Sequence, residues 1–140
     1  MKKKGVKMKF HSERIDDIMK KFFRLSSSLK RAVQLSDYQE ISEMPTKRFW
    51  VSEERAYFVI NSMINGRQLP RMCQSRDRMY GDILSRVKSL MQTDKTIELL
   101  DACIKVINSP APCSYLTPLT IKTLISVNRR KWIKEHKQEI

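Results

Sequence analysis

Apolar residues recur at steps of three and four along most of this chain, and that spacing predicts amphipathic helices. The first such stretch follows Ser12, which we expect to cap a helix. The three serines at 26–28 are expected to weaken or break that helix. Its apolar stripe consists of Ile15, Ile18, Met19, Phe22, Leu25, Leu29 and Val33.

Five further helices are predicted from the same spacing combined with start and stop residues. Ser36 with Gln39 fits a capping box, and Pro45 ends the short helix that follows. Ser52 is expected to cap the next helix, which Asn65–Gly66 stops in a left-handed turn. The last three helices are expected to start at Ser75, Thr96 and Thr117 and to end near Met91, Ile107 and Lys137.

Two segments of the chain follow the same plan. Each has a proline stop, an aromatic–aliphatic pair, a hydroxyl cap and an amphipathic helix. A shift of 65 residues places Pro45 on Pro110, Trp50 on Tyr115 and Ser52 on Thr117. We expect the two aromatic residues to be buried anchors at equivalent corners. Few side chains are identical, so internal duplication and a chance likeness of two capped helices both stay open.

These patterns predict an all-α protein, and the composition agrees. Gly (3) and Pro (5) are too scarce for the many tight turns of an all-β fold. We expect a single compact domain of five or six helices, with the two helix–loop–helix units as candidates for an internal duplication. Residues 1–10, with five lysines, are expected to form a flexible basic arm, and residues 11–140 the helical domain.

The charge of the chain favours a polyanionic partner. Lys and Arg total 28 against 15 Asp and Glu, a net charge of +13. No apolar run approaches the roughly 18 residues of a membrane span. The start, MKKKGVKMKF, lacks the apolar core of a signal peptide, so we expect a cytoplasmic protein.

No feature of the sequence predicts catalysis or a cofactor. Cys73, Cys103 and Cys113 form no C-x-x-C pair, and the two histidines lie near the ends, so no zinc site is expected. Glycine-rich phosphate loops and nucleophile motifs are missing from the sequence. The acidic pairs, Asp16–Asp17 and Glu53–Glu54, point about 100° apart on a helix and do not converge on a substrate.

The positive charge is concentrated in three parts of the chain. Residues 1–35 carry a net +8, residues 67–92 a net +4 and residues 119–140 a net +4. On the last helix, one side is apolar and the other carries a basic stripe, which predicts contact with phosphates or a major groove. A solvated helix face is the alternative. Trp132 lies on the apolar side and is expected to plug the core. The predicted nucleic-acid-binding residues are Lys122, Ser126, Arg129, Arg130, Lys134 and Lys137 on this helix, Arg67, Arg71, Arg76 and Arg78 in the basic linker, and Lys2, Lys3 and Lys4 in the arm.

The motifs RFWVSEERA and SPAP..YLTP resemble those of small uncharacterised basic helical proteins carried by phages and mobile elements of Bacteroidales bacteria. The likeness covers roughly Pro45 to Trp132, and Leu119 and Lys122 depart from the second motif. It implies a bacterial host cell and a phage or mobile-element setting, and it brings no functional residues.

The leading prediction is a small protein that binds DNA as a regulator or accessory factor of a phage or mobile element, with RNA as a variant. The alternative is a protein-interaction or structural component, such as a phage virion or assembly protein, with a basic surface and no sequence-specific DNA binding. A membrane-surface role ranks third, and a homodimer or a protein partner stays open.

Overall fold

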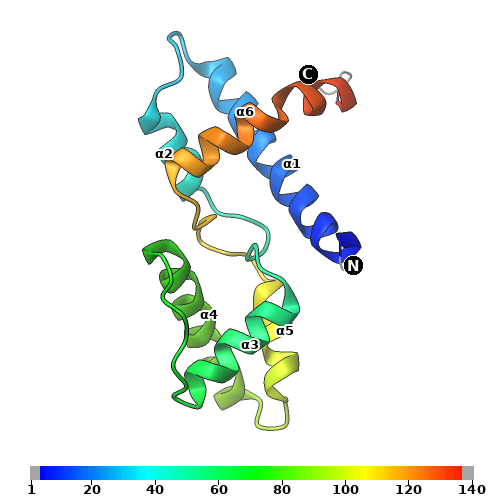
Figure 1. The fold of residues 1–140 in the computed structure, drawn as a ribbon, viewed down its shortest axis with the longest axis vertical. Helices are drawn as coiled ribbons and strands as arrows, with labels where there is room; N and C mark the ends of the chain where they lie inside the picture. The colour runs from blue at the N-terminus through cyan, green and yellow to red at the C-terminus, as the bar shows by residue number, and fades with distance from the viewer. Residues whose placement is uncertain (1–3, 137–140) are drawn as a thin grey trace. The chain divides into compact units, whose positions relative to one another are not determined.

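Six helices occupy most of residues 4–136, the part of the chain that the computed structural model describes, with side chains from residue 10 onward. They are α1 (Lys4–Ser28), α2 (Leu35–Glu43), α3 (Glu53–Ile64), α4 (Gln74–Thr93), α5 (Leu99–Ile107) and α6 (Pro118–Glu135) (Figure 1). No strand forms within residues 4–136, where Thr46 and Ala111 make an isolated β-bridge. The all-α prediction is confirmed.

The contacts group these helices into two compact units. Unit 1 consists of residues 1–44 and 116–140, and it contains α1, α2 and α6. Unit 2 consists of residues 45–115, and it contains α3, α4 and α5. Each unit has its own apolar core. The expected single domain over 11–140 stays a prediction, because the grouping does not test whether the units unfold together.

The chain can be divided into two halves, α1–α3 and α4–α6, and the two halves exchange their third helices. In unit 1, α6 packs against α1 and α2, which come from the other half of the chain (Figure 1). In unit 2, α3 packs in the same way against α4 and α5. Each unit is therefore a three-helix arrangement of two helices from one half and the third helix from the other half.

The correspondence between the halves extends beyond the segments in which the sequence showed it. The ends of α1 and α4 lie 65 residues apart, as do the starts of α3 and α6. Helices α2 and α5 both contain 9 residues. Thr46 and Ala111, also 65 apart, pair with each other through two backbone hydrogen bonds of 3.0 Å. The halves are thus equivalent in topology, which supports duplication and leaves its evolutionary origin a prediction.

The two corners before α3 and α6 follow the predicted plan. Ser52 accepts a hydrogen bond from the N–H of Arg55 at 3.1 Å, and Thr117 accepts one from the N–H of Thr120 at 3.2 Å. Both corner aromatics are buried, with Trp50 6% and Tyr115 7% exposed. The corners differ in one respect, since Tyr115 has a left-handed backbone with φ of 61°.

The side chain of Tyr115 holds that left-handed corner in place. Its ring stacks on Phe49 with centroids 5.9 Å apart, and its hydroxyl donates a hydrogen bond to the carboxylate of Asp82. A left-handed conformation is costly for a bulky residue, so these contacts must offset the strain. Burial, and then the hydrogen bond to Asp82, raise the pKa of the Tyr115 hydroxyl, which keeps the donor proton in place.

Four predicted helix starts are wrong. Helix α1 begins at Lys4, so Ser12 lies inside the helix and not at its start. Helix α2 follows Gln34, since the Asp37 carboxylate accepts the N–H of Gln34 at 2.7 Å and fixes an earlier start than Ser36.

The other two starts move in opposite directions. Cys73 occupies the N-cap position of α4, two residues before the expected Ser75, and its side chain makes no capping hydrogen bond. Helix α5 begins only after Glu98, because Thr96 gives both its N–H and its hydroxyl to the Asp94 carboxylate, at 3.0 and 2.7 Å, in a local turn. The stop at Gly66, with φ of 67°, is confirmed.

Candidate nucleic-acid interface

Helix α6 is anchored in unit 1 by its apolar side. Thr117 caps the helix and Pro118 occupies its first turn, where a missing N–H costs nothing. Ile121, Ile125 and Trp132 are buried against α1 and α2. The indole N–H of Trp132 donates to Asp16 at 3.0 Å. The predicted role of Trp132 as a core plug is confirmed, and the opposite side of α6 is left to solvent.

The solvent side of α6 carries a row of residues spaced by four. We call the exposed residues on this side the α6 outer face: Leu119, Lys122, Thr123, Ser126, Val127, Arg130, Lys131 and Lys134. Residues at this spacing lie above one another on a helix, about 6 Å apart along its axis. Lys122, Ser126, Arg130 and Lys134 therefore follow one line over about 18 Å.

A second row runs beside the first and contains residues that sequence reasoning missed. Leu119 and Val127 are 65% and 73% exposed, unusual for apolar residues on a helix with a well-formed buried side. Thr123 lies between them, and Lys131 completes the row. The same four-residue spacing would have identified them. The middle of the α6 outer face is thus made of small side chains, with cations toward its ends.

The structure corrects the placement of Arg129. Its guanidinium lies over the ring of Phe22 at 5.5 Å and over the ring of Phe23 at 6.0 Å. Arg129 is exposed, but it sits at the edge of the core of unit 1 and not in the row that contains Arg130. A substitution of Arg129 would therefore affect packing as well as charge.

Three acidic side chains of unit 1 pair with cations away from the α6 outer face. Asp16 pairs with Lys20 at 3.2 Å and Asp17 with Lys21 at 2.8 Å, both within α1. The Asp37 carboxylate accepts hydrogen bonds from both terminal nitrogens of Arg31, at 2.8 and 3.0 Å. Within residues 10–136, no carboxylate lies within ion-pairing distance of the four cations on the α6 outer face. The described part of the chain therefore leaves their charge without an acidic partner.

The charge of the chain is uneven between the units. Unit 1 contains 17 of the 28 Lys and Arg and 8 of the 15 Asp and Glu, a net charge of +9. Unit 2 contains the other 11 and 7, a net charge of +4. The α6 outer face therefore belongs to the more positive unit, which favours approach of an anion.

The predicted arginines of the basic linker all belong to unit 2. Arg67 and Arg71 lie in the segment between α3 and α4, and Arg76 lies in the first turn of α4; all three are exposed. Arg78 is also exposed, but its guanidinium covers the Tyr115 ring at 5.3 Å and donates to the Cys113 sulfur at 3.5 Å. That these arginines extend the basic surface of α6 stays a prediction.

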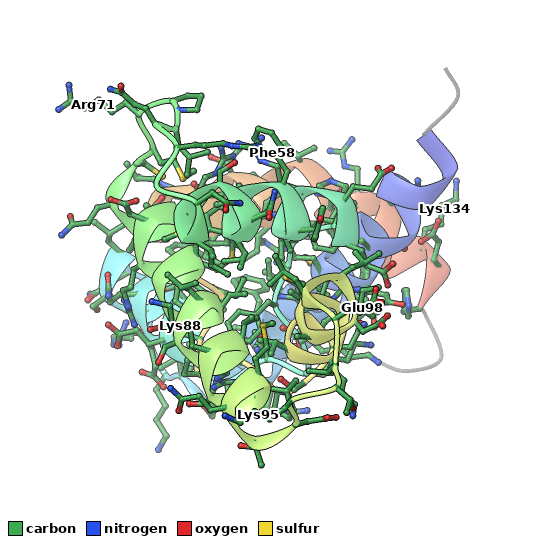
Figure 2. All side chains as sticks on the ribbon, turned by 90° about the horizontal axis from the view of Figure 1, so that it is seen from below. Phe58, Arg71, Lys88, Lys95, Glu98 and Lys134 are labelled. Carbon is green, nitrogen blue, oxygen red and sulfur yellow. The ribbon has the colours of Figure 1, made fainter. Side chains whose placement is uncertain are left out.

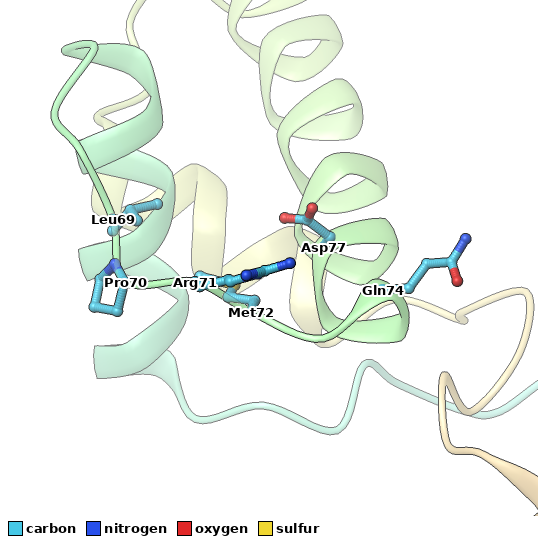
Figure 3. A pocket seen from close by; sticks show the side chains of 6 residues that line it. All are labelled: Leu69, Pro70, Arg71, Met72, Gln74 and Asp77. Carbon is cyan, nitrogen blue, oxygen red and sulfur yellow. The ribbon is translucent and has the colours of Figure 1, made fainter.

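A hollow of about 560 Å³ adjoins one of these arginines, Arg71. It is lined by Leu69, Pro70, Arg71, Met72, Gln74 and Asp77. Figure 3 shows the Arg71 side chain running from the loop toward Asp77 on α4. Because the lining carries both signs of charge, the hollow is not a cationic cradle for a phosphate.

The predicted residues of the arm lie mostly outside the described part of the chain. This holds for Lys2, Lys3 and also Lys137. Lys4 is the first residue of α1, so the backbone of residues 4–10 is helical where a flexible arm was expected.

Two of the cysteines differ sharply in environment. Cys73 is exposed at the start of α4, where the backbone N–H of Arg76 and then the hydroxyl of Ser75 lower the pKa of its thiol. Cys103 is fully buried in unit 2, and burial raises the pKa of its thiol to about 11. Among the described residues, no cluster of His, Cys, Asp and Glu could hold a metal ion.

Alkylation should therefore be selective for Cys73. At pH 7 we expect limiting iodoacetamide to modify Cys73 at least about tenfold faster than Cys103, because the thiolate is the reacting form. The rate at Cys73 should also begin to rise at a lower pH than for a free cysteine. Peptide mass spectrometry across a pH series measures this, with Cys73→Ser as the control. Equal rates at the two cysteines would contradict it.

Comparison of the chain with protein-family models, with curated proteins and with solved structures finds no match. The likeness to phage and mobile-element proteins is therefore untested. No helix among the described residues is long and apolar enough to cross a bilayer.

Proposed function

We propose that this protein binds duplex DNA through the α6 outer face. The observation that carries the proposal is the row of Lys122, Ser126, Arg130 and Lys134, whose cations have no carboxylate partner among residues 10–136. Lysine and arginine in a line along one helix suit the phosphates that flank a major groove, which is wide enough to admit an α-helix.

The centre of the α6 outer face suits contact with base edges. Thr123 and Ser126 offer hydroxyl groups that can donate or accept hydrogen bonds. Leu119 and Val127 are exposed and do not belong to the core of unit 1, so their apolar side chains are free to contact thymine methyl groups. In this arrangement Lys122, Arg130, Lys131 and Lys134 supply affinity, and the small central residues supply sequence preference.

The biological role that we propose is that of a regulator or accessory factor of a phage or mobile element in a bacterial cell. It is supported by the likeness of the two sequence motifs. RNA is the alternative nucleic acid. Single-stranded bases usually stack on a β-sheet of the binding protein, and residues 4–136 form no sheet.

A double substitution tests the proposal. Lys122→Gln with Arg130→Gln should weaken binding to duplex DNA, because each lost phosphate contact lowers the slope of log K against log salt by about 0.9. The slope should therefore flatten by about 1.8, while the fold stays intact because both positions are exposed. Fluorescence anisotropy at several salt concentrations measures the slope.

The matched control is Lys88→Gln with Lys95→Gln, which removes the same charge from exposed positions of unit 2 (Figure 2). This control should leave the slope within about 0.5 of the wild-type value. Equal slopes for the wild type and the Lys122/Arg130 variant would contradict the proposal and favour the alternative of an interaction or structural protein. Tighter binding to single-stranded RNA than to duplex DNA would instead favour the RNA variant.

A further inference from the structure

Helix α3 presents a second exposed face, and its chemistry is different from that of α6. We call its exposed and half-buried residues at alternating steps of three and four the α3 outer face: Glu54, Tyr57, Phe58, Asn61, Ile64 and Asn65. Phe58 is 51%, Ile64 44% and Tyr57 36% exposed. Phe58 projects away from the core of unit 2 (Figure 2). Large apolar side chains grouped in this way on a small unit indicate a contact with another molecule.

The comparison between α3 and α6 rules out the same kind of partner for both. The two helices occupy equivalent places in their units, and a shift of 65 residues relates their outer faces. Under that shift, Glu54 takes the place of Leu119, Tyr57 that of Lys122 and Asn65 that of Arg130. The α3 outer face has thus lost the row of cations that a phosphate backbone needs, and it has gained aromatic area and a carboxylate. The one cation within α3 is Arg55, whose guanidinium lies over the Phe58 ring at 5.7 Å.

The charges at the two ends of α3 are opposite and fixed in position. Glu53 and Glu54 lie in its first turn. Arg67 follows the left-handed turn at Gly66, and its backbone N–H donates to the carbonyl of Ser62 at 2.9 Å, which holds it at the other end of the helix. Within residues 10–136, neither Glu54 nor Arg67 takes part in a salt bridge.

These features make the α3 outer face complementary to itself. If two α3 helices lie antiparallel, with the midpoint between Ile60 and Asn61, then Glu54 of each lies opposite Arg67 of the other. The same register sets Tyr57 opposite Ile64 and brings the two Asn61 amides together at the centre. A symmetric pair of this kind uses the same surface twice, as isologous dimers do.

We propose that the α3 outer face binds the α3 outer face of a second copy of this chain, in this antiparallel register. The interface is small, since α3 extends over only about 18 Å. Interfaces below about 1,200 Å² are weak, so the dimer should dissociate in the micromolar range, on the order of 10–100 μM. The two ion pairs lie at its rim, where they set the register and make association depend on salt.

Sedimentation velocity of the full chain without DNA tests the dimer. The wild type should shift from monomer to dimer as its concentration rises through this range, and less so at high salt. Phe58→Asp should weaken association at least about tenfold, because it buries a charge within the contact. The control is Leu100→Asp, which alters an apolar residue of similar exposure on α5 (44% against 51% for Phe58) and should leave association unchanged.

Charge reversal separates this proposal from a general loss of fold. Glu54→Arg alone and Arg67→Glu alone should each stay monomeric, because each places like charges opposite one another. A mixture of the two variants should associate, because both pairs are then Arg with Glu. A wild type that stays monomeric throughout the range, or variants that show no recovery on mixing, would overturn the proposal. DNA binding through α6 is measured separately, so either result leaves that test independent.

Discussion

Replacing Trp132 with alanine is expected to lower the free energy of unfolding by about 3–5 kcal/mol, the cost of removing a large buried aromatic residue. Trp132 is 6% exposed, and its ring stacks on Phe23 with centroids 5.4 Å apart and on His136 at 4.1 Å. The substitution also takes the N–H donor away from Asp16. Helix α6 would lose its last buried anchor, so its C-terminal turns should fray.

Urea denaturation followed by circular dichroism measures this loss. The control is Val127→Ala on the same helix, which should change stability by no more than about 0.5 kcal/mol because Val127 is exposed. A loss below about 0.5 kcal/mol for Trp132→Ala would mean that the indole is not packed in the core, and the description of unit 1 would be wrong.

Cutting the chain between α3 and α4 is expected to leave the two pieces bound to each other. A protease site inserted in the exposed segment between these helices would divide the chain into α1–α3 and α4–α6. Because each unit contains helices from both pieces, separation would expose the buried side of α6 and that of α3 together. That loss of apolar burial opposes dissociation.

Size-exclusion chromatography of the cut protein gives the result. A single peak that contains both pieces, at the volume of the uncut insertion variant, is the expected outcome. If each half instead folded on itself, with α3 on α1 and α2, the pieces would elute separately. That outcome would contradict the exchange of third helices.

The exchange could not be predicted from the sequence, although the repeat could. Ser52, Thr117, Pro118 and Gly66 act on neighbouring backbone, so their effects follow from local rules. Whether α3 or α6 becomes the third helix of a given unit depends on packing between distant residues. The amphipathic pattern of α3 is compatible with the third-helix position of either unit. The predicted start of α5 at Thr96 is wrong for a different reason. The hydroxyl of Thr96 donates to Asp94 in a local turn and is therefore not available to cap the helix.

The candidate interface was partly predictable for the same reason. Lys122, Ser126 and Arg130 follow from helical spacing alone, and the structure exposes all three. Arg129 differs because its guanidinium lies over rings of α1, a contact that spacing on α6 cannot reveal. The exposed Leu119 and Val127 were missed because an apolar residue on a helix is usually counted toward the core.

The discontinuity of unit 1 has a consequence for the order of events during protein synthesis. Unit 2 has all three of its helices once residue 115 has left the ribosome, so it can fold while the rest of the chain is still being made. Unit 1 must wait for α6, and until then the apolar stripes of α1 and α2 stay uncovered. The nascent chain therefore passes through a stage with one finished core and one open core, and the open core is where chaperones or misfolding would act first.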